Sequence, residues 1–517
     1  MQGSSRPDRE LLDAAALCSH LLGEGSVHAL LAEHRHRLFP DSMFTDLFPT
    51  NRGRPSVPAD VIATVMVLQA LEGLSDREAV RQLETNIAWK CATGLALTDE
   101  AFHSTVLVLW RNKLRGSDKP QRIFDAVRAV ITESGVIAGK TRRALDSTVL
   151  DDAVARQDTV TMISTQIRRV RKLIPELASV WVREHNLEPG RPPCDWEDPG
   201  DRDRLVSELV DDANELVWAV EDLVEAGLEL SDTQVDAVAL LALVAGQDVE
   251  PGDKPGQWRI NRGTAVGRVI STVDPETRHA HKTRSAYRDG YKAHVAAEPD
   301  TGLVTACDIG PGNVGDADAA PGLIADEPAG TEVLGDCAYG SGEFRDHLEG
   351  RGMQPVIKPP PLHPAVPGGY TIDDFTITDT TVTCPEGHTV TITKSRTARF
   401  SKHCRTCPVK ARCTKATAGR TIKVHAQHRL LADARRQAAT DTFDDVYRNK
   451  RPMIERTIAW LTAKYNRRLR YRGIERNQLG WSHRCAAINL KRLLNLGLNY
   501  DTGWTITTPT GTDAATV

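Results

Sequence analysis

The sequence lacks any apolar run long enough to cross a lipid bilayer. Its most apolar stretch, VDAVALLALVAG at residues 235–246, is shorter than the roughly 20 residues that a membrane-spanning helix needs. The first twenty residues also lack the basic start and the long apolar core of a signal peptide. We therefore expect a cytoplasmic protein with no membrane partner.

A net positive charge is also missing, because the formal charge of the 517-residue chain is −4. Composition alone therefore gives no argument for binding to nucleic acid. The charge is unevenly distributed, however. Residues 448–492 are strongly basic and contain only Glu455 and Glu475 as acids, whereas residues 195–255 are rich in Asp and Glu. This asymmetry predicts one region that faces a polyanion and one that faces away from it.

A disulfide framework is not expected for the ten cysteines, because we expect the chain to be cytoplasmic. Four of the cysteines fall close together in the sequence: Cys384, Cys404, Cys407 and Cys413. Thiolates at the spacing C-x19-C-x2-C-x5-C suit tetrahedral Zn²⁺, and His388 or His403 could replace one ligand. We predict a structural zinc ion, with core cysteines that bind no metal as the alternative.

The N-terminal part of the chain has helical periodicity. Residues 10–130 alternate apolar and polar side chains with a helical period, interrupted at Gly73 and Gly94. Ser75 opens the S-x-x-E pattern of a capping box. We expect residues 1–135 to form a helical domain that binds DNA or mediates dimerisation, with helix packing alone as the alternative.

The remaining domain boundaries are placed where the sequence pattern changes between helical and strand periodicity. The expected fold class is α/β. We expect a mixed-sheet core formed by residues 136–152, 276–358 and 429–497, the last segment helical and basic. We also expect a helical insertion at 153–275, a β-rich cysteine insertion at 359–428 and a disordered tail at 498–517. The helical insertion could be a clamp on DNA or a dimer contact. Its acidic half argues against contact with DNA.

The strand segments of the core include a hairpin. GYKAHVAAE and GLVTACDIG flank the turn PDTG. Lys292 and His294 are expected on the solvated face of the first of these strands, with a position on the functional side of the sheet as the alternative. A helix is expected from Asp316 to Ile324, and the strand in GMQPVIKPPP is expected to stop at its prolines.

Three acidic residues stand at notable positions. Asp146 in ALDSTV and Asp336 in EVLGDCAYGSGE are each predicted to end a strand. Glu455 lies in a predicted helix that has Pro452 in its first turn. It sits at the edge of an apolar stripe formed by Ile454, Ile458, Leu461, Tyr465 and Leu469.

Converging carboxylates would repel one another and raise at least one pKa. Divalent cations relieve this repulsion, and Mg²⁺ prefers carboxylate and phosphate oxygens. Two such ions can activate a water molecule and stabilise the leaving oxygen of a phosphodiester. Asp336 would then pair with a metal rather than with a basic side chain. Taken singly, a strand-end Asp is more often a turn former, and Glu455 could simply pair with Arg451.

The order of these motifs resembles that of the DDE transposases of bacterial insertion sequences. ALDSTVLDDA is similar to their first strand motif, and EVLGDCAYGSGE to their second, D-x-x-Y-x-S. RPMIERTIAWLTAKYNRRLRYRG is similar to their third, a helix with R-x-x-x-E followed by basic residues. The segment FTDLFPTNRGRPSVPADVIATVMVLQALEGLSDREAVRQL resembles the helical domain that opens many of them, and some carry a similar CP-x-G and C-x-x-C-P cysteine pair.

This resemblance implies a ribonuclease H-like catalytic core. Asp146, Asp336 and Glu455 would be the catalytic triad and would bind two Mg²⁺ ions, with Mn²⁺ as a substitute. The implied reaction is cleavage of DNA at the ends of an insertion sequence, followed by attack of the freed 3′-hydroxyl on target DNA. The implied partners are double-stranded DNA, namely the terminal inverted repeats and the target, and a second copy of the chain in a homodimer on the nucleoid.

Two positions depart from the family signature. Tyr447 lies one residue early, and Thr462 stands where a lysine is common, with Lys464 two residues late. The side chains expected to contact DNA are basic and follow or adjoin Glu455: Arg451, Lys464, Arg467, Arg468, Arg470 and Arg472. Of these, Arg467 or Arg468 could take over the role of the missing lysine.

Two other functions are compatible with the same residues. One is a ribonuclease H-like nuclease that cuts without strand transfer. The other is a non-catalytic DNA-binding protein derived from a transposase, although the presence of all three acids speaks against it.

Overall fold

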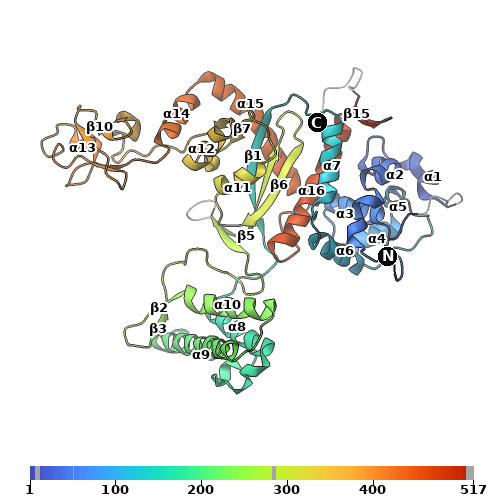
Figure 1. Ribbon diagram of the computed structural model, residues 1–517, viewed down its shortest axis with the longest axis horizontal. Coiled ribbons are helices and arrows are strands. Elements are labelled where there is room, and N and C mark those ends of the chain that lie inside the picture. The colour runs from blue at the N-terminus through green and yellow to red at the C-terminus, as the bar shows by residue number, and fades with distance from the viewer. Residues whose placement is uncertain (6–11, 51, 282–286, 508–517) are drawn as a thin grey trace.

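The computed structural model describes residues 1–5, 12–50, 52–281 and 287–507. Three regions surround a central sheet (Figure 1). The N-terminal helices lie at one end of the molecule and the cysteine-rich segment at the opposite end. A helical insertion projects from the sheet on a third side. Among the described helices, none has the length and apolar character that crossing a membrane requires.

The N-terminal region is helical, as its periodicity predicted. Gly73 and Gly94 end α3 and α5 in the left-handed conformation, with φ of 71° and 67°. Ser75 and Glu78 form the expected capping box at the start of α4. The helices are α1 (Ala14–Cys18), α2 (Val27–Leu38), α3 (Ala59–Glu72), α4 (Asp76–Thr85), α5 (Ile87–Thr93), α6 (Thr105–Arg115) and α7 (Arg122–Glu133).

The central sheet is mixed and has the strand order β4-β5-β1-β7-β8, with β6 also paired to β5. β1 is antiparallel to β5 and parallel to β7, and β7 is parallel to β8. The strands are β1 (Arg142–Asp151), β4 (Arg278–His281), β5 (Tyr287–Ala297), β6 (Val304–Pro311), β7 (Glu332–Gly335) and β8 (Gln354–Ile357). The hairpin expected around PDTG is the β5–β6 pair.

Helices cover both faces of this sheet. On one face α11 (Asp316–Leu323) and α12 (Gly342–Gly350) pack against Leu145 and Ala296. On the other face α15 (Asp441–Leu461) and α16 (Ile474–Asn495) pack against Ala144 and Val295, together with α7. The expected ribonuclease H-like α/β core with a helical N-terminal region is therefore confirmed.

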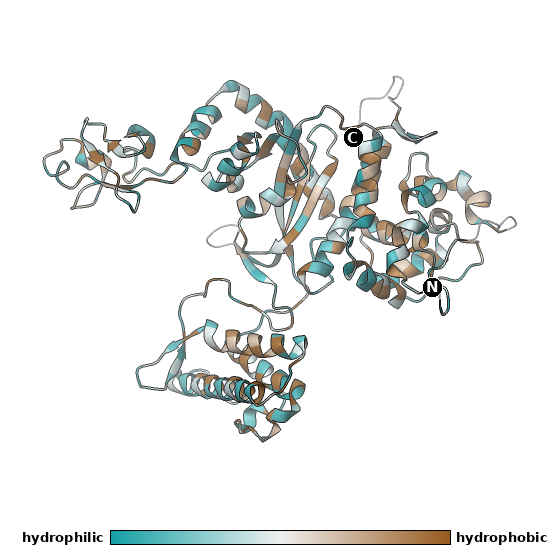
Figure 2. Ribbon diagram, in the orientation of Figure 1, coloured by the Kyte–Doolittle hydropathy of each residue, from teal (hydrophilic) through white to brown (hydrophobic). Residues whose placement is uncertain are grey.

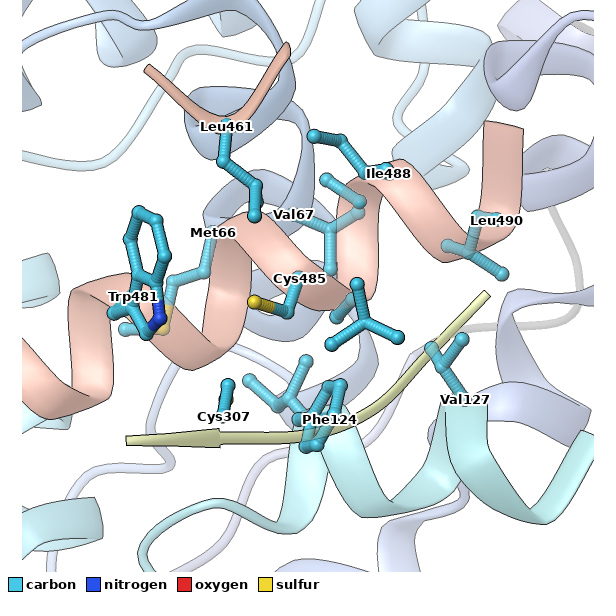
Figure 3. Close-up of a cluster of buried hydrophobic side chains, with 14 of the residues drawn as sticks. Met66, Val67, Phe124, Val127, Cys307, Leu461, Trp481, Cys485, Ile488 and Leu490 are labelled. Carbon is cyan, nitrogen blue, oxygen red and sulfur yellow. The ribbon is translucent and has the colours of Figure 1, made fainter. Parts of the chain in front are cut away.

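Helix α16 lies at the centre of the largest hydrophobic core. Figure 3 shows Trp481, Cys485 and Ile488 along α16, with Cys307 of β6 and Phe124 of α7 packed on one side of the helix. Residues of α3 belong to the same core, so α16 joins the N-terminal helices to the sheet. Figure 2 shows hydrophobic residues gathered along α16 and α7 where these helices meet.

The helical insertion has a hydrophobic core of its own. It contains α8 (Thr159–Leu173), α9 (Pro199–Glu225) and α10 (Asp232–Gln247), with a small sheet of β2 (Val249–Pro251) and β3 (Trp258–Ile260). Its return segment caps α16. Asp274 accepts a hydrogen bond from the Gly473 N–H at 3.2 Å, and Glu276 accepts one from the Ile474 N–H at 2.7 Å.

The cysteine-rich segment is built from short strands around a separate small core. Its strands are β9 (Thr376–Ile377), β10 (Thr381–Thr383), β11 (Thr389–Thr391), β12 (Thr397–Arg399) and β13 (Thr421–Lys423), and it includes α13 (Lys410–Cys413). Helix α14 (His428–Ala438) then leads back to α15.

Three local expectations were wrong. β1 does not end at Asp146, because β5 continues to pair with it as far as Asp151. α15 begins at Asp441, where the Thr440 side chain accepts a hydrogen bond from the Phe443 N–H, and Pro452 is inside the helix. The helix ends at Leu461, so Tyr465 is not on its apolar stripe but 93% exposed.

The tail is also shorter than expected. Residues 498–506 form a hairpin of β14 (Leu498–Tyr500) and β15 (Trp504–Ile506) rather than a disordered segment. Trp504 is buried and its ring packs edge-on against His34 of α2, with the ring centroids 5.3 Å apart. The rest of the predicted tail, 508–517, lies outside the described residues.

Asn489 should be essential to the attachment of α16 to the sheet. Its fully buried side chain accepts a hydrogen bond from the Val304 N–H and donates one to the Val304 carbonyl, both at 2.8 Å. Asn489→Ala leaves both backbone groups unsatisfied, so we expect the free energy of unfolding to fall by about 2–4 kcal/mol. Urea denaturation, monitored by tryptophan fluorescence, measures this change in the free energy of unfolding. The exposed Asn112→Ala is the control, and an equal loss in both variants would contradict the assignment.

His483 should make the protein sensitive to acid. Burial, and then Arg111, lower the pKa of this α16 histidine to about 3, so the folded state keeps it neutral. The unfolded state binds its proton near pH 6.5, and stability is therefore lost as the pH falls from 6.5 towards 3, by up to about 1.4 kcal/mol per pH unit. His483→Leu should flatten this dependence between pH 6.5 and 4 in urea denaturation, whereas the surface variant His20→Leu should not.

Candidate active site

Three carboxylates that are far apart in the sequence meet at one arginine. The Nη1 atom of Arg451 lies 3.2 Å from Oδ2 of Asp146 and 3.9 Å from Oε1 of Glu455. Its Nη2 atom lies 3.8 Å from Oδ2 of Asp336. The structure therefore brings together all three acids singled out in the sequence, and it gives Asp336 a basic partner.

The two aspartates are brought together by the parallel strands β1 and β7. The last residue pair between these strands is Ala144 with Leu334. Two residues further on, β1 carries Asp146 and the chain after β7 carries Asp336. The carboxyl ends of neighbouring parallel strands lie at one edge of a sheet, which is a common place for binding sites.

The environments of the two aspartates differ. The side chain of Asp146 is 15% exposed, and burial raises the pKa of its carboxyl although Arg451 opposes this effect. The Ser147 N–H donates to its Oδ1 at 2.9 Å. Asp336 is 43% exposed, and its Oδ1 accepts a hydrogen bond from the Ala338 N–H at 2.9 Å. Asp336 therefore also caps the short turn that follows β7.

Helix α15 presents the third acid. Tyr447, Arg451 and Glu455 are spaced four residues apart, so they lie on one face of the helix. The position of Tyr447, one residue early relative to the family signature, therefore still places it on the face of Arg451. Glu455 is 65% exposed and is the most open of the three carboxylates.

Arg451 is itself buried, with a side chain that is 6% exposed. Burial alone would lower the pKa of its guanidinium, but the neighbouring Asp146 and Asp336 raise it, so the group is charged. Its Nε atom is buried and has no hydrogen-bond partner among the described residues. Arg451 was expected to contact DNA, which stays a prediction, and in the structure its guanidinium lies against the carboxylates.

The three carboxylates form an all-oxygen donor set of the kind that Mg²⁺ prefers, and they converge on one positive group. Each of the three carboxylates faces the guanidinium of Arg451, which occupies the space between them. Accordingly, within the described part of the chain no three His, Cys, Asp or Glu side chains are grouped tightly enough to hold a metal ion. The residue types fit the metal, and the side chains as they lie are arranged around Arg451.

The basic residues after Glu455 that were expected to contact DNA differ in their surroundings. Lys464 donates to the Leu71 carbonyl at 3.4 Å, and Arg470 donates to the carbonyls of Gly73 and Leu74, so both hold the N-terminal helices. Arg468 and Arg472 are exposed.

Arg467 contacts the strand that carries Asp146, whereas Lys464 contacts the N-terminal helices. Its Nη1 donates to Thr148 Oγ1 at 3.2 Å, and Thr148 is two residues beyond Asp146, on the same face of β1. Of the two proposed substitutes for the signature lysine, Arg467 is thus the one whose side chain reaches this strand.

Lys358 is a neighbour of the site that the sequence motifs did not reveal. It follows β8, its backbone N–H donates to the Gly335 carbonyl at 3.2 Å, and its side chain is exposed. Its ammonium lies 5.9 Å from the centre of the Tyr447 ring. Only the pairing of β8 with β7 brings this lysine next to Asp336.

A second polar cluster lies on the opposite face of the sheet. Lys292 Nζ is 3.2 Å, and His294 Nδ1 3.8 Å, from Asp316 Oδ1. His294 was expected on a solvated face, but it is fully buried because α11 covers this side of β5. Burial lowers the pKa of His294 to about 4.

The four clustered cysteines line one small cavity together with His388 and His403. The two imidazole rings stack with their centres 4.6 Å apart. The Gly387 N–H donates to the Cys384 carbonyl at 2.8 Å and closes the C-P-x-G turn. The Arg420 N–H points at Cys404 Sγ, 3.4 Å away. All ten cysteines of the chain are free.

Two family models match the chain. A model described as "Transposase DDE domain" matches residues 383–494, which include the cysteine cluster and α15 with Glu455. A model described as "Transposase domain (DUF772)" matches residues 27–113 in the N-terminal helices. No curated protein and no solved structure gave a match. The two family matches confirm that the chain resembles the DDE transposases of insertion sequences, as its motifs predicted.

Proposed function

We propose that this chain is a metal-dependent transposase that cuts DNA at the ends of an insertion sequence and joins the freed 3′-hydroxyl ends to target DNA. The observation that carries the proposal is the meeting of Asp146, Asp336 and Glu455 at one positive group. The match of residues 383–494 to a transposase DDE domain supports the same class of reaction.

Asp146, Asp336 and Glu455 would hold two Mg²⁺ or Mn²⁺ ions. When bound, such ions lower the pKa of an attacking water and neutralise charge on the leaving oxygen of a phosphodiester. The chain itself contributes rigid placement of the ligands. Asp146 is fixed within a sheet strand, and Asp336 by its capping hydrogen bond. Precise placement of this kind supplies much of the catalysis in phosphoryl transfer.

The two chemical steps are alike and can use one site. In the first, water attacks a phosphodiester at the transposon end and releases a 3′-hydroxyl. In the second, that hydroxyl attacks a phosphodiester of the target and displaces another 3′-oxygen. Each step breaks one P–O bond and forms another, so the same three carboxylates serve both.

Exposed basic residues near the carboxylates would hold the DNA backbone. Lys358 lies beside Asp336, and Arg468 and Arg472 follow α15 with exposed side chains. Contacts with phosphates position the duplex without reading its sequence. A double-stranded DNA partner is thus compatible with a chain whose net charge is −4. A homodimer in the transposition complex is part of the same proposal.

Cleavage should depend on Asp336. With Mg²⁺ and labelled DNA that carries the element's own ends, the wild type should cut, whereas Asp336→Asn should lose at least about 100-fold in rate. Asp346→Asn, an exposed aspartate on α12, is the matched control. Gel analysis separates the outcomes: joined products indicate a transposase, cutting without joining indicates a nuclease, and binding without cutting indicates a non-catalytic DNA-binding protein.

We also propose that the cysteine-rich segment binds one structural zinc ion through Cys384, Cys404, Cys407 and Cys413. The support is that all four thiols line one cavity and that the backbone N–H of Arg420 approaches the sulfur of Cys404. This segment has only a small hydrophobic core, and a metal cross-link stabilises such segments. His388 or His403, which line the same cavity, could replace one thiolate.

Zinc content tests this second proposal. The purified wild type should carry about one zinc per chain by elemental mass spectrometry, and Cys407→Ser should carry far less and lose protection from proteolysis in residues 370–428. Cys18→Ser, which changes a cysteine outside the cluster, should keep its zinc. A wild type that binds no zinc after refolding with the metal would identify the four residues as core cysteines.

A further inference from the structure

Arg451 occupies the position of the cation that the three carboxylates need. Its guanidinium lies within 4 Å of Asp146, Asp336 and Glu455, and these contacts come from three different segments of the chain. Without a positive group between them, three such carboxylates would repel one another. The arginine therefore neutralises the cluster from inside the protein.

We propose that Arg451 is an internal counter-ion that holds the three carboxylates together until a divalent cation displaces it. This inference rests on the proposed function, because it assumes that the same carboxylates bind Mg²⁺. A guanidinium and a dication cannot both stay within 4 Å of these oxygens without strong repulsion in a partly buried site. Metal binding and the arginine contacts are therefore mutually exclusive.

The exposure of the side chains favours this exchange. Asp336 and Glu455 are 43% and 65% exposed, so a cation can reach them from the solvent. Arg451 is 6% exposed and reaches the carboxylates from the protein side. The Nε atom of Arg451 has no hydrogen-bond partner among the described residues, so the guanidinium is not fully satisfied where it lies. Its contacts with Asp336 and Glu455 are also longer than ordinary hydrogen bonds.

The exchange has two consequences for the protein. In the absence of metal, Arg451 keeps the acids close together and in place. In the presence of metal, displacement of the arginine costs free energy. The affinity of the site for Mg²⁺ is therefore lower than the affinity that the three carboxylates would have without Arg451. The displaced guanidinium stays on the face of α15 that carries Tyr447 and Glu455, where it can meet a DNA phosphate.

Calorimetric titration with Mg²⁺ tests the competition without DNA. Arg451→Met removes the charge and keeps much of the side-chain length, and it should bind Mg²⁺ about tenfold more tightly than the wild type. In EDTA the same variant should melt at a lower temperature, and Mg²⁺ should raise its melting temperature more than it raises that of the wild type. Arg448→Met is the matched control, because Arg448 is exposed on the same helix and pairs with Asp444 at 2.8 Å.

A second measurement uses the wild type and does not depend on the folding of a variant. Phenylglyoxal modifies accessible arginines, and peptide mass spectrometry locates the modified residue. Arg451 should be protected in EDTA and become at least about fivefold more reactive in saturating Mg²⁺, in keeping with its release from a buried ion pair. Arg448 should react equally in both conditions.

The outcomes separate this inference from the proposed function. Equal or weaker Mg²⁺ binding by Arg451→Met, or unchanged labelling of Arg451 while the wild type binds Mg²⁺, would overturn the counter-ion role and leave the metal-dependent transposase intact. Failure of both the wild type and Arg451→Met to bind Mg²⁺ would overturn both. Tighter binding by Arg451→Met together with metal-induced labelling would establish the exchange.

Discussion

Unpaired charge is unfavourable in a protein interior, and this constraint governs the centre of the molecule. Asp146 lies within a sheet strand and Arg451 lies on a helix packed against that strand, and neither side chain is well exposed. Each is tolerated because the other is present. Their pairing requires α15 to lie against β1, and this placement also brings Glu455 towards Asp336. The position of one helix relative to one strand thus defines the whole cluster.

Helix α16 stabilises the face of the sheet against which α15 packs. It packs on the same face of the sheet as α15 and connects the sheet to the N-terminal helices through one continuous hydrophobic core. Its N-terminus is capped by Asp274 and Glu276, which end the helical insertion. The insertion and the cysteine-rich segment have hydrophobic cores of their own.

Much of the fold follows from local patterns. The glycine-ended helices, the capping box at Ser75 and the hairpin at PDTG were predicted, because each depends on backbone preferences of a few neighbouring residues. The errors arose where distant segments override local signals. Asp146 looked like a strand end, but pairing with β5 extends β1 by five residues. Pro452 looked like a helix start, yet tertiary packing and the Thr440 cap keep the helix intact on both sides of it.

The sequence by itself determined which chemical groups this protein has: three acids in separate motifs, a basic band and four closely spaced cysteines. It also determined the order of strands and helices from which the sheet is built. Only the tertiary structure decided that the acids meet around Arg451, that Lys358 stands beside Asp336 and that His294 is buried. These facts depend on which strand pairs with which and on which face a helix covers. Such long-range contacts leave no periodic signal in the sequence.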